Sequence, residues 1–107
     1  MNRVMKLIVV ATIIVLGSLV SYGQTAKQLF EKGAEYSDVA NFSEAIKCYK
    51  KAAEKGYAEA QYLLGDCYKN GLWVEQDSTE AVKWFRKAAG QGYEAAQDKL
   101  SKLGESW

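Results

Sequence analysis

The chain repeats one stretch of thirteen residues, reading YKKAAEKGYAEAQ from Tyr49 to Gln61 and FRKAAGQGYEAAQ from Phe85 to Gln97. Seven of the thirteen positions are identical, and the two stretches lie 36 residues apart. A period of about 20–50 residues is typical of helical solenoids, because one helix pair cannot bury its apolar side until the next pair stacks on it. The repetition therefore predicts an all-α fold, a short α-solenoid of antiparallel helix pairs.

Apolar residues recur at helical spacing on both sides of the repeated stretch. Asn41 and Asp77, each followed three positions later by glutamate, have the pattern of helix N-caps. Gly56 and Gly92 stand where a left-handed residue can close a helix. We therefore expect five helices, near residues 25–39, 42–55, 58–70, 78–90 and 93–103.

The first 23 residues have the layout of a secretory signal peptide. Two basic residues and no acidic ones precede an uncharged run from Leu7 to Val20, and small residues, Ser21 and Gly23, precede a cleavage point before Gln24. The run of fourteen residues is shorter than the roughly 17–25 that span a bilayer. We expect export to the periplasm or beyond, with an uncleaved N-terminal membrane anchor as the alternative.

Composition excludes several classes of function for residues 24–107. Twelve basic and thirteen acidic residues give a formal charge of −1, which is no footprint for nucleic acid or an anionic membrane. The chain has no histidine, the commonest general base and metal ligand. Its two cysteines do not form a zinc motif. We therefore predict no catalytic residues, no metal, no cofactor and no nucleic-acid partner.

Longer motifs carry a family resemblance. They read AEAQYLLGDCYKNG at residues 58–71, VEQD at 74–77 and TEAVKWFRKAAGQG at 79–92. This pattern resembles the Sel-one-like repeat, a branch of the tetratricopeptide-like solenoids. The resemblance implies one repeat domain over residues 24–107, comprising repeat one at 26–56, repeat two at 57–92 and a capping helix at 93–104. It also leads us to expect Ala45 opposite Gly33 and Ala81 opposite Gly65.

The resemblance implies a partner-binding surface lined by the first helix of each pair. The candidate residues on that surface are Phe30, Tyr62, Asp66, Lys69 and Asn70. Phe30 and Tyr62 are the expected aromatic anchors, since aromatic residues dominate interface energetics. The alternative is that Phe30 packs against the segment next to the signal peptide and that Tyr62 only shields a helix stem.

Trp73 departs from the family pattern, which usually has glycine at that place in the loop. A large indole at a loop tip is typical of an interaction hot spot, so Trp73 is a further partner-binding candidate. The alternative is that Trp73 folds back over the edge of the helices at 58–70 and 78–90.

Cys48 and Cys67 lie on either side of the turn at Gly56, nearly level in an antiparallel helix pair. A disulfide between them would suit an exported protein. The alternative is that both are small buried residues at helix contacts, where cysteine is common.

From these observations we expect a module that binds a protein or peptide and is a monomer or a weak homo-oligomer. One alternative is a structural subunit of an envelope oligomer. Another is a ligand-binding or enzymatic member, which would need a deeper polar pocket than a chain of this length readily encloses.

Overall fold

The computed structural model describes residues 24–107, so the predicted signal segment lies outside the described residues. Five α-helices follow one another in this part of the chain: α2 (Ala26–Asp38), α3 (Phe42–Glu54), α4 (Ala58–Asn70), α5 (Ser78–Ala89) and α6 (Glu94–Lys102). Each predicted helix is present with its bounds within one residue, and the all-α fold is confirmed. None of these helices combines the length and the hydropathy that crossing a bilayer requires.

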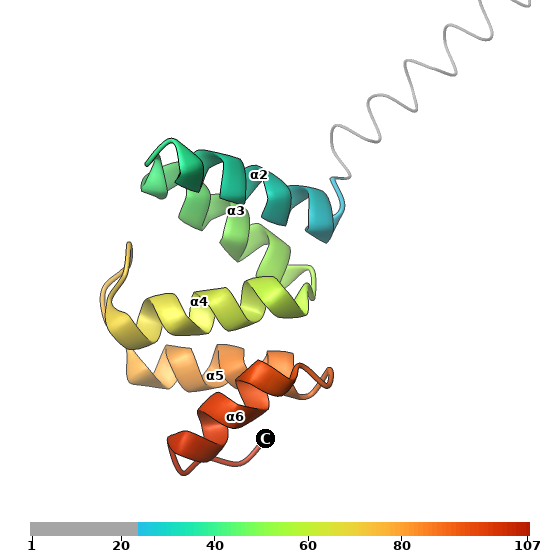
Figure 1. Cartoon of the computed structure of the whole chain (residues 1–107), viewed down its shortest axis with the longest axis vertical. Coiled ribbons are helices and arrows are strands. Elements are labelled where there is room, and N and C mark those ends of the chain that lie inside the picture. Colours follow the sequence, from blue (N-terminus) through green and yellow to red (C-terminus); the bar gives the residue numbers. More distant parts are fainter. Residues whose placement is uncertain (1–23) are drawn as a thin grey trace, which may run out of the picture.

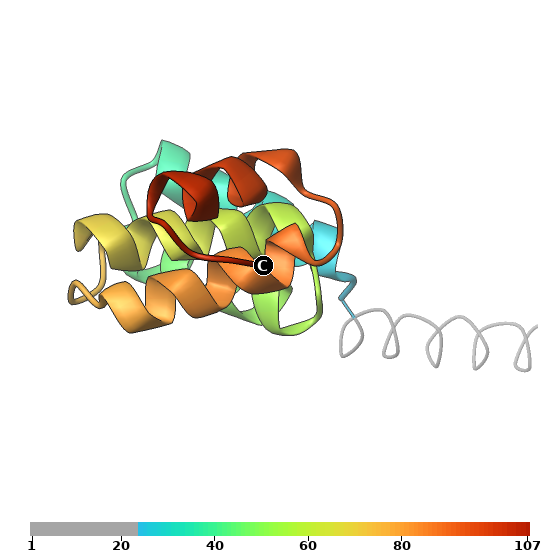
Figure 2. The ribbon, with the colours of Figure 1, turned by 90° about the horizontal axis from the view of Figure 1, so that it is seen from below.

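The helices form a stack in which each contacts the next along the chain (Figure 1). The connections within the pairs α2–α3 and α4–α5 lie on one edge of the stack, and those between pairs lie on the other (Figures 1 and 2). The α2–α3 connection spans residues 39–41, whereas the α4–α5 connection spans residues 71–77. Equivalent positions are therefore 32 residues apart between α2 and α4. They are 36 residues apart between α3 and α5 and between α4 and α6.

Polar side chains begin three of the helices. The side chains of Asn41 and Asp77 each accept a hydrogen bond from the backbone N–H three residues on, at 3.4 and 3.1 Å, as predicted. Thr25 and Gln28, which sequence reasoning did not single out, form a full capping box in front of α2. These contacts satisfy backbone donors that a helix start leaves free.

The repeated stretch supplies the same polar contact twice. Gln61 Nε2 donates to the carbonyl oxygen of Ala53 at 3.1 Å, and Gln97 Nε2 donates to that of Ala89 at 3.1 Å. In each case an amide on the first helix of one repeat meets the last turn of the preceding helix. Each carbonyl oxygen also accepts a hydrogen bond from a backbone N–H of the turn that follows, Gly56 or Gly92, so the glutamine adds a second bond that fixes how the next helix sits on the previous one.

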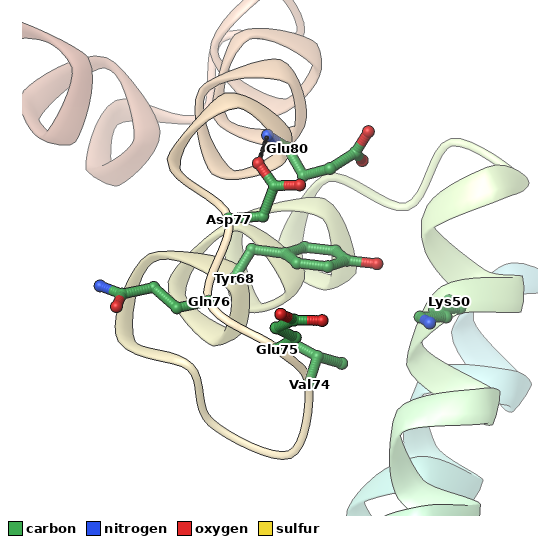
Figure 3. A pocket seen from close by; sticks show the side chains of 7 residues that line it. All are labelled: Lys50, Tyr68, Val74, Glu75, Gln76, Asp77 and Glu80. Atoms are coloured by element: carbon green, nitrogen blue, oxygen red, sulfur yellow. Dashed lines mark hydrogen bonds between the residues drawn. The ribbon is translucent and has the colours of Figure 1, made fainter.

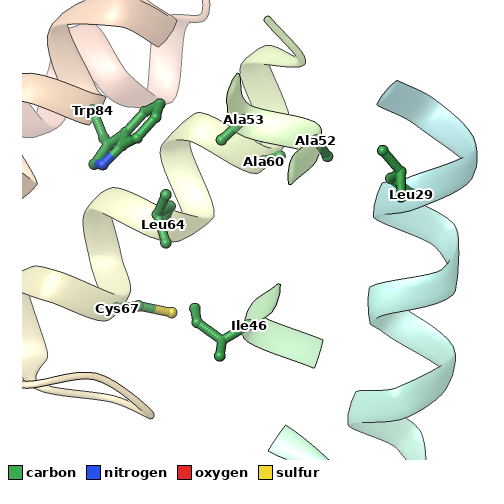
Figure 4. Packing of buried hydrophobic residues seen from close by; sticks show 8 residues of the cluster. All are labelled: Leu29, Ile46, Ala52, Ala53, Ala60, Leu64, Cys67 and Trp84. Atoms are coloured by element: carbon green, nitrogen blue, oxygen red, sulfur yellow. The ribbon is translucent and has the colours of Figure 1, made fainter. Parts of the chain in front are cut away.

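Small residues fill the contact between α3 and α4. Ala53 and Ala60 are at most 1% exposed, which lets these helix backbones approach closely. Larger side chains, including Leu64 and Trp84, complete this core (Figure 4). A second cluster lies between α5 and α6, and its buried members are Ala81, Phe85, Ala88, Ala89, Ala96 and Leu100.

Two helical glycines lie beneath aromatic rings and not opposite alanines, which corrects the expected pairing. A Cβ on Gly65 would lie 2.6 Å from the ring of Phe85, and one on Gly33 would lie 2.8 Å from the ring of Tyr49. Ala45 and Ala81 are buried as expected. The glycines thus make room for the rings, so in each pair an aromatic side chain of the second helix packs against the backbone of the first.

The outermost helices carry polar residues where the central helix α4 carries core residues. Exposed Lys32 and Glu35 of α2 hold the positions of buried Leu64 and Cys67 in α4. In α6, exposed Asp98 and Ser101 hold the positions of Tyr62 and Gly65. A polar outer face is what a terminal helix of a solenoid requires.

Candidate functional site

Phe30, one of the two expected anchors, is half-buried in an aromatic cluster at the junction of the two repeats. Its ring is tilted against Tyr49, with centroids 5.4 Å apart, and against Tyr57, with centroids 5.2 Å apart. Tilted pairs at this separation are stabilising. The ring therefore packs within the fold, against α3 and against the residue that precedes α4.

Tyr62 holds the equivalent place in the second repeat. Its ring is tilted against Phe85, with centroids 5.8 Å apart, and against Tyr93, with centroids 5.3 Å apart. Burial, followed by the charge of nearby Asp66, raises the pKa of the Tyr62 hydroxyl above its ordinary value. The second anchor is therefore also packed within the fold.

The polar candidates at the end of α4 are divided among different contacts. Asp66 Oδ1 is enclosed and lies 3.3 Å from Lys99 Nζ, so Asp66 joins α4 to α6. The backbone carbonyl of Lys69 accepts a hydrogen bond from Gln76 Nε2 at 2.8 Å, which ties the loop to the helix. Asn70 is exposed at the last position of α4.

Trp73 lies in the loop with its backbone in the left-handed region, at φ +64°. Its ring stacks on that of Phe42 at the start of α3, with centroids 4.7 Å apart and planes 11° from parallel. The side chain is half-buried and packs against the core. Trp73 thus folds back onto the molecule, with its ring stacked on the first residue of α3 in the preceding helix pair.

An open groove of about 610 Å³ lies between α3 and the α4–α5 loop (Figure 3). It is lined by Lys50, Tyr68, Val74, Glu75, Gln76, Asp77 and Glu80. Lys50 projects from α3, and the other residues come from the end of α4, the loop and the first turn of α5. None of the six predicted partner-binding residues lines this groove.

The groove combines an aromatic side chain with charges of both signs. Lys50 Nζ lies 5.9 Å from the centroid of the Tyr68 ring. Asp77 is occupied in capping α5, and Glu80 Oε1 lies 3.9 Å from Lys83 Nζ, whereas Glu75 is exposed. In residues 24–107, no group of three or more His, Cys, Asp or Glu side chains could hold a metal ion. The arrangement is suited to contact with a polar peptide.

Comparison with known families identifies the architecture. The sequence profile of the Sel1 repeat matches residues 16–57 and residues 58–93, which is more than half of the chain. The chain belongs to the Sel1 repeat family. The second match spans α4 and α5 together with the turn after them. The first match begins within the predicted signal segment.

Two solved structures show the same fold. A Sel1 repeat protein from Oxalobacter formigenes is 30% identical with a TM-score of 0.72, over 85% of this chain and 71% of that one. A protective antigen present in uropathogenic Escherichia coli strains, which displays an SLR fold, is 34% identical with a TM-score of 0.73. The similarity covers 80% of this chain but only 19% of the antigen. No curated protein sequence matches this chain.

The backbone of Trp73 accounts for the glycine that Sel1-like repeats usually have there. A left-handed residue other than glycine is disfavoured by roughly 1–2 kcal/mol, because its Cβ approaches the following carbonyl oxygen. We expect Trp73→Gly to be more stable than Trp73→Ala by about 0.5–1 kcal/mol, since both lose the indole but only glycine relieves the backbone. Urea unfolding of the two variants measures the difference.

Leu72 supplies the matched control for this comparison, because its φ is not positive. There we expect the order to reverse, with Leu72→Ala more stable than Leu72→Gly. An alanine variant at position 73 as stable as the glycine variant would contradict the assignment of strain to Trp73.

Cys48 and Cys67 are both free and buried. Cys48 faces α2, with its Cβ 3.2 Å from the place where a Cβ on Gly33 would lie. Cys67 packs in the cluster that includes Ile46 of α3 (Figure 4). Ile46 and Cys48 are two residues apart and so point to opposite sides of α3. The thiols are therefore placed at different helix contacts, as in the alternative of two small buried residues.

Burial, followed by the charge of Asp66, raises the pKa of the Cys67 thiol from 9.0 to about 11. The native thiol is therefore uncharged at pH 8, and only the thiolate reacts readily. We expect Cys67 in a Cys48→Ser variant to react with iodoacetamide far more slowly in the native state than in denaturant. Equal rates in the two states would contradict this assignment.

The same shift has a consequence for stability. As the pH rises, the thiol of the unfolded chain loses its proton before that of the native chain. The contribution of Cys67 to the free energy of unfolding is therefore fully present below about pH 9 and is lost as the pH rises toward 11. The free energy of unfolding measured across this pH range should fall, and the fall should be smaller in Cys67→Ala than in the unaltered chain.

Sequence reasoning missed the groove because its walls come from distant parts of the chain. Lys50 belongs to the first repeat, whereas Tyr68 and Glu75 belong to the second. The usable signal was the loop sequence VEQD, whose carboxylates lie between the end of α4 and the start of α5. Helix periodicity alone does not show that these positions meet.

Proposed function

We propose that this Sel1 repeat protein is an exported module that binds a protein or peptide and has no catalysis of its own. The observation that carries the proposal is the groove beside Lys50, which joins the two repeats and whose lining is mostly side chains of an exposed loop. Loops held by a rigid scaffold commonly carry binding functions.

The groove offers contacts that an extended peptide can use. Tyr68 and Val74 provide apolar surface, and Lys50 and Glu75 provide charges of opposite sign. Mixed polar and aromatic lining of this kind is common at protein interfaces. Most of the residues first expected to bind a partner are instead engaged within the fold, so the groove takes their place as the candidate site.

Site-specific photo-crosslinking tests the proposal. A benzophenone amino acid is placed at position 75 in the groove and, as a control, at position 98 on the outer face of α6. Both native side chains are exposed, so neither substitution disturbs the core. We expect discrete protein adducts, in cells that make the protein naturally, from position 75 and not from position 98. Adducts at neither position, or equally at both, would overturn the groove as the binding site.

Export is supported by the charge and length pattern of residues 1–23. We expect the mature chain to begin at Gln24. Intact mass measurement of the protein recovered from the cell envelope decides between this and a retained anchor, because a chain that still includes residues 1–23 would exclude cleavage there.

A further inference from the structure

The outer face of α5 carries three cations around a second hollow. Lys83, Arg86 and Lys87 lie with Thr79 and Val82 around a space of about 460 Å³. Lys87 Nζ is placed 4.4 Å from the centroid of the Trp84 ring, and Lys83 lies 3.9 Å from Glu80. The hollow therefore has an apolar floor at Val82 and a basic rim.

Part of this hollow is already occupied by an extended segment of the chain itself. Arg86 Nη2 donates to Glu105 Oε2 at 2.8 Å, and Arg86 Nε donates to the carbonyl oxygen of Ser106 at 2.9 Å. Residues 105–107 have no regular secondary structure, and Trp107 is 58% exposed. The guanidinium thus holds one carboxylate and one main-chain carbonyl, the groups that any extended acidic peptide presents.

The occupying segment is held weakly and pairs with only one of the three cations that line the hollow. The side chains of Arg86 and Glu105 are 47% and 42% exposed, and ion pairs this exposed to solvent contribute little to stability. Glu105 is the one carboxylate lining the hollow, against three cations. A partner with several carboxylates would match this rim better than Glu105 does.

We propose that the basic face of α5 is a second binding surface, which takes an extended acidic peptide segment, and that residues 105–107 compete with that segment for Arg86. This surface is separate from the groove beside Lys50 and does not depend on it. Removing the competitor should therefore strengthen binding, whereas removing Arg86 should abolish the gain.

Fluorescence anisotropy at low salt tests the proposal with a labelled peptide, GESWGESW, and its matched control, GQSWGQSW. We expect GESWGESW to bind about two- to fivefold more tightly to a chain ending at Gly104 than to the unaltered chain, since the competing charge pair, which is exposed and weak, is gone. Glu105→Gln in the full chain should show part of the same gain, which keeps the test valid if the shortened chain folds poorly. Adding Arg86→Gln to the shortened chain should remove the gain.

Three results would overturn the proposal. One is equal affinity of GESWGESW for the shortened, Glu105→Gln and unaltered chains. Another is equal affinity for GESWGESW and GQSWGQSW, which would show that the surface does not recognise the carboxylates. The third is a dimer by light scattering that disappears in the shortened chain, because the occupant would then be the same segment of a second copy.

Discussion

Replacing Phe85 with alanine is expected to lower the free energy of unfolding by about 3–5 kcal/mol. The side chain is fully buried, contacts the ring of Tyr62 and covers Gly65, so its removal leaves a cavity at the centre of the second helix pair. Because small domains are stable by only about 5–15 kcal/mol, the variant should be close to unfolding at room temperature. Chemical denaturation followed by circular dichroism measures the loss.

Phe42→Ala is the matched control for this prediction. The Phe42 ring is 38% exposed and stacks on Trp73. Its loss should therefore cost about 1 kcal/mol, the contribution of one aromatic pair and partial burial. Similar denaturation midpoints for the two variants would show that Phe85 is not the central contact of its pair.

Gly65→Ala should lower the free energy of unfolding by about 1–3 kcal/mol, because the new methyl group would overpack the contact with Phe85. Its Cβ would lie 2.6 Å from two ring carbons of Phe85, closer than carbon atoms approach. The sign is informative, since alanine in place of glycine within a helix otherwise stabilises by roughly 0.5–1 kcal/mol. Thermal and urea unfolding give the sign directly.

A double-mutant cycle separates this clash from a general effect on the helix. Phe85→Leu removes the ring carbons that the methyl group would meet, so Gly65→Ala should cost less in that background than in the unaltered chain. Costs that simply add would mean that Gly65 is required for a reason other than the ring.

Most of the fold could be predicted from the sequence because several local signals agree. Apolar residues at helical spacing define each helix, and Asn41 and Asp77 mark helix starts at which the structure has its caps. Gly56 and Gly92 have φ values of +94° and +86°, as the predicted left-handed turns require. Each of these signals depends on residues close in the chain, so no tertiary contact was needed to read them.

Contacts between helices were harder to predict, as the glycines illustrate. In both pairs the glycine lies five residues before the end of the first helix, and the aromatic ring lies seven residues after the start of the second. The expected partners, Ala45 and Ala81, lie one turn nearer the connection. Periodicity gives the face on which a residue lies, but the level at which two helices meet depends on their connection and packing.

The candidate site was the least predictable part. Phe30 and Tyr62 lie on the expected helices, but each ring packs against one ring of its own repeat and one at the start of the next unit. Trp73 was singled out for its departure from the family pattern, and its positive φ supplies the reason for that pattern. Neither side-chain direction nor a single backbone angle can be inferred from residue type alone.

The polar substitutions on α2 and α6 limit how copies of this protein can associate. Head-to-tail stacking joins two different surfaces of each copy, and it grows into filaments wherever the rotation does not close a ring. A copy that docked on α2 as α3 docks on α4 would bury Lys32 and Glu35, which are exposed here. Burying such charges without partners is costly. The same four positions, 32, 35, 98 and 101, that close each stack therefore also oppose polymerisation, and apolar residues there should favour fibre growth.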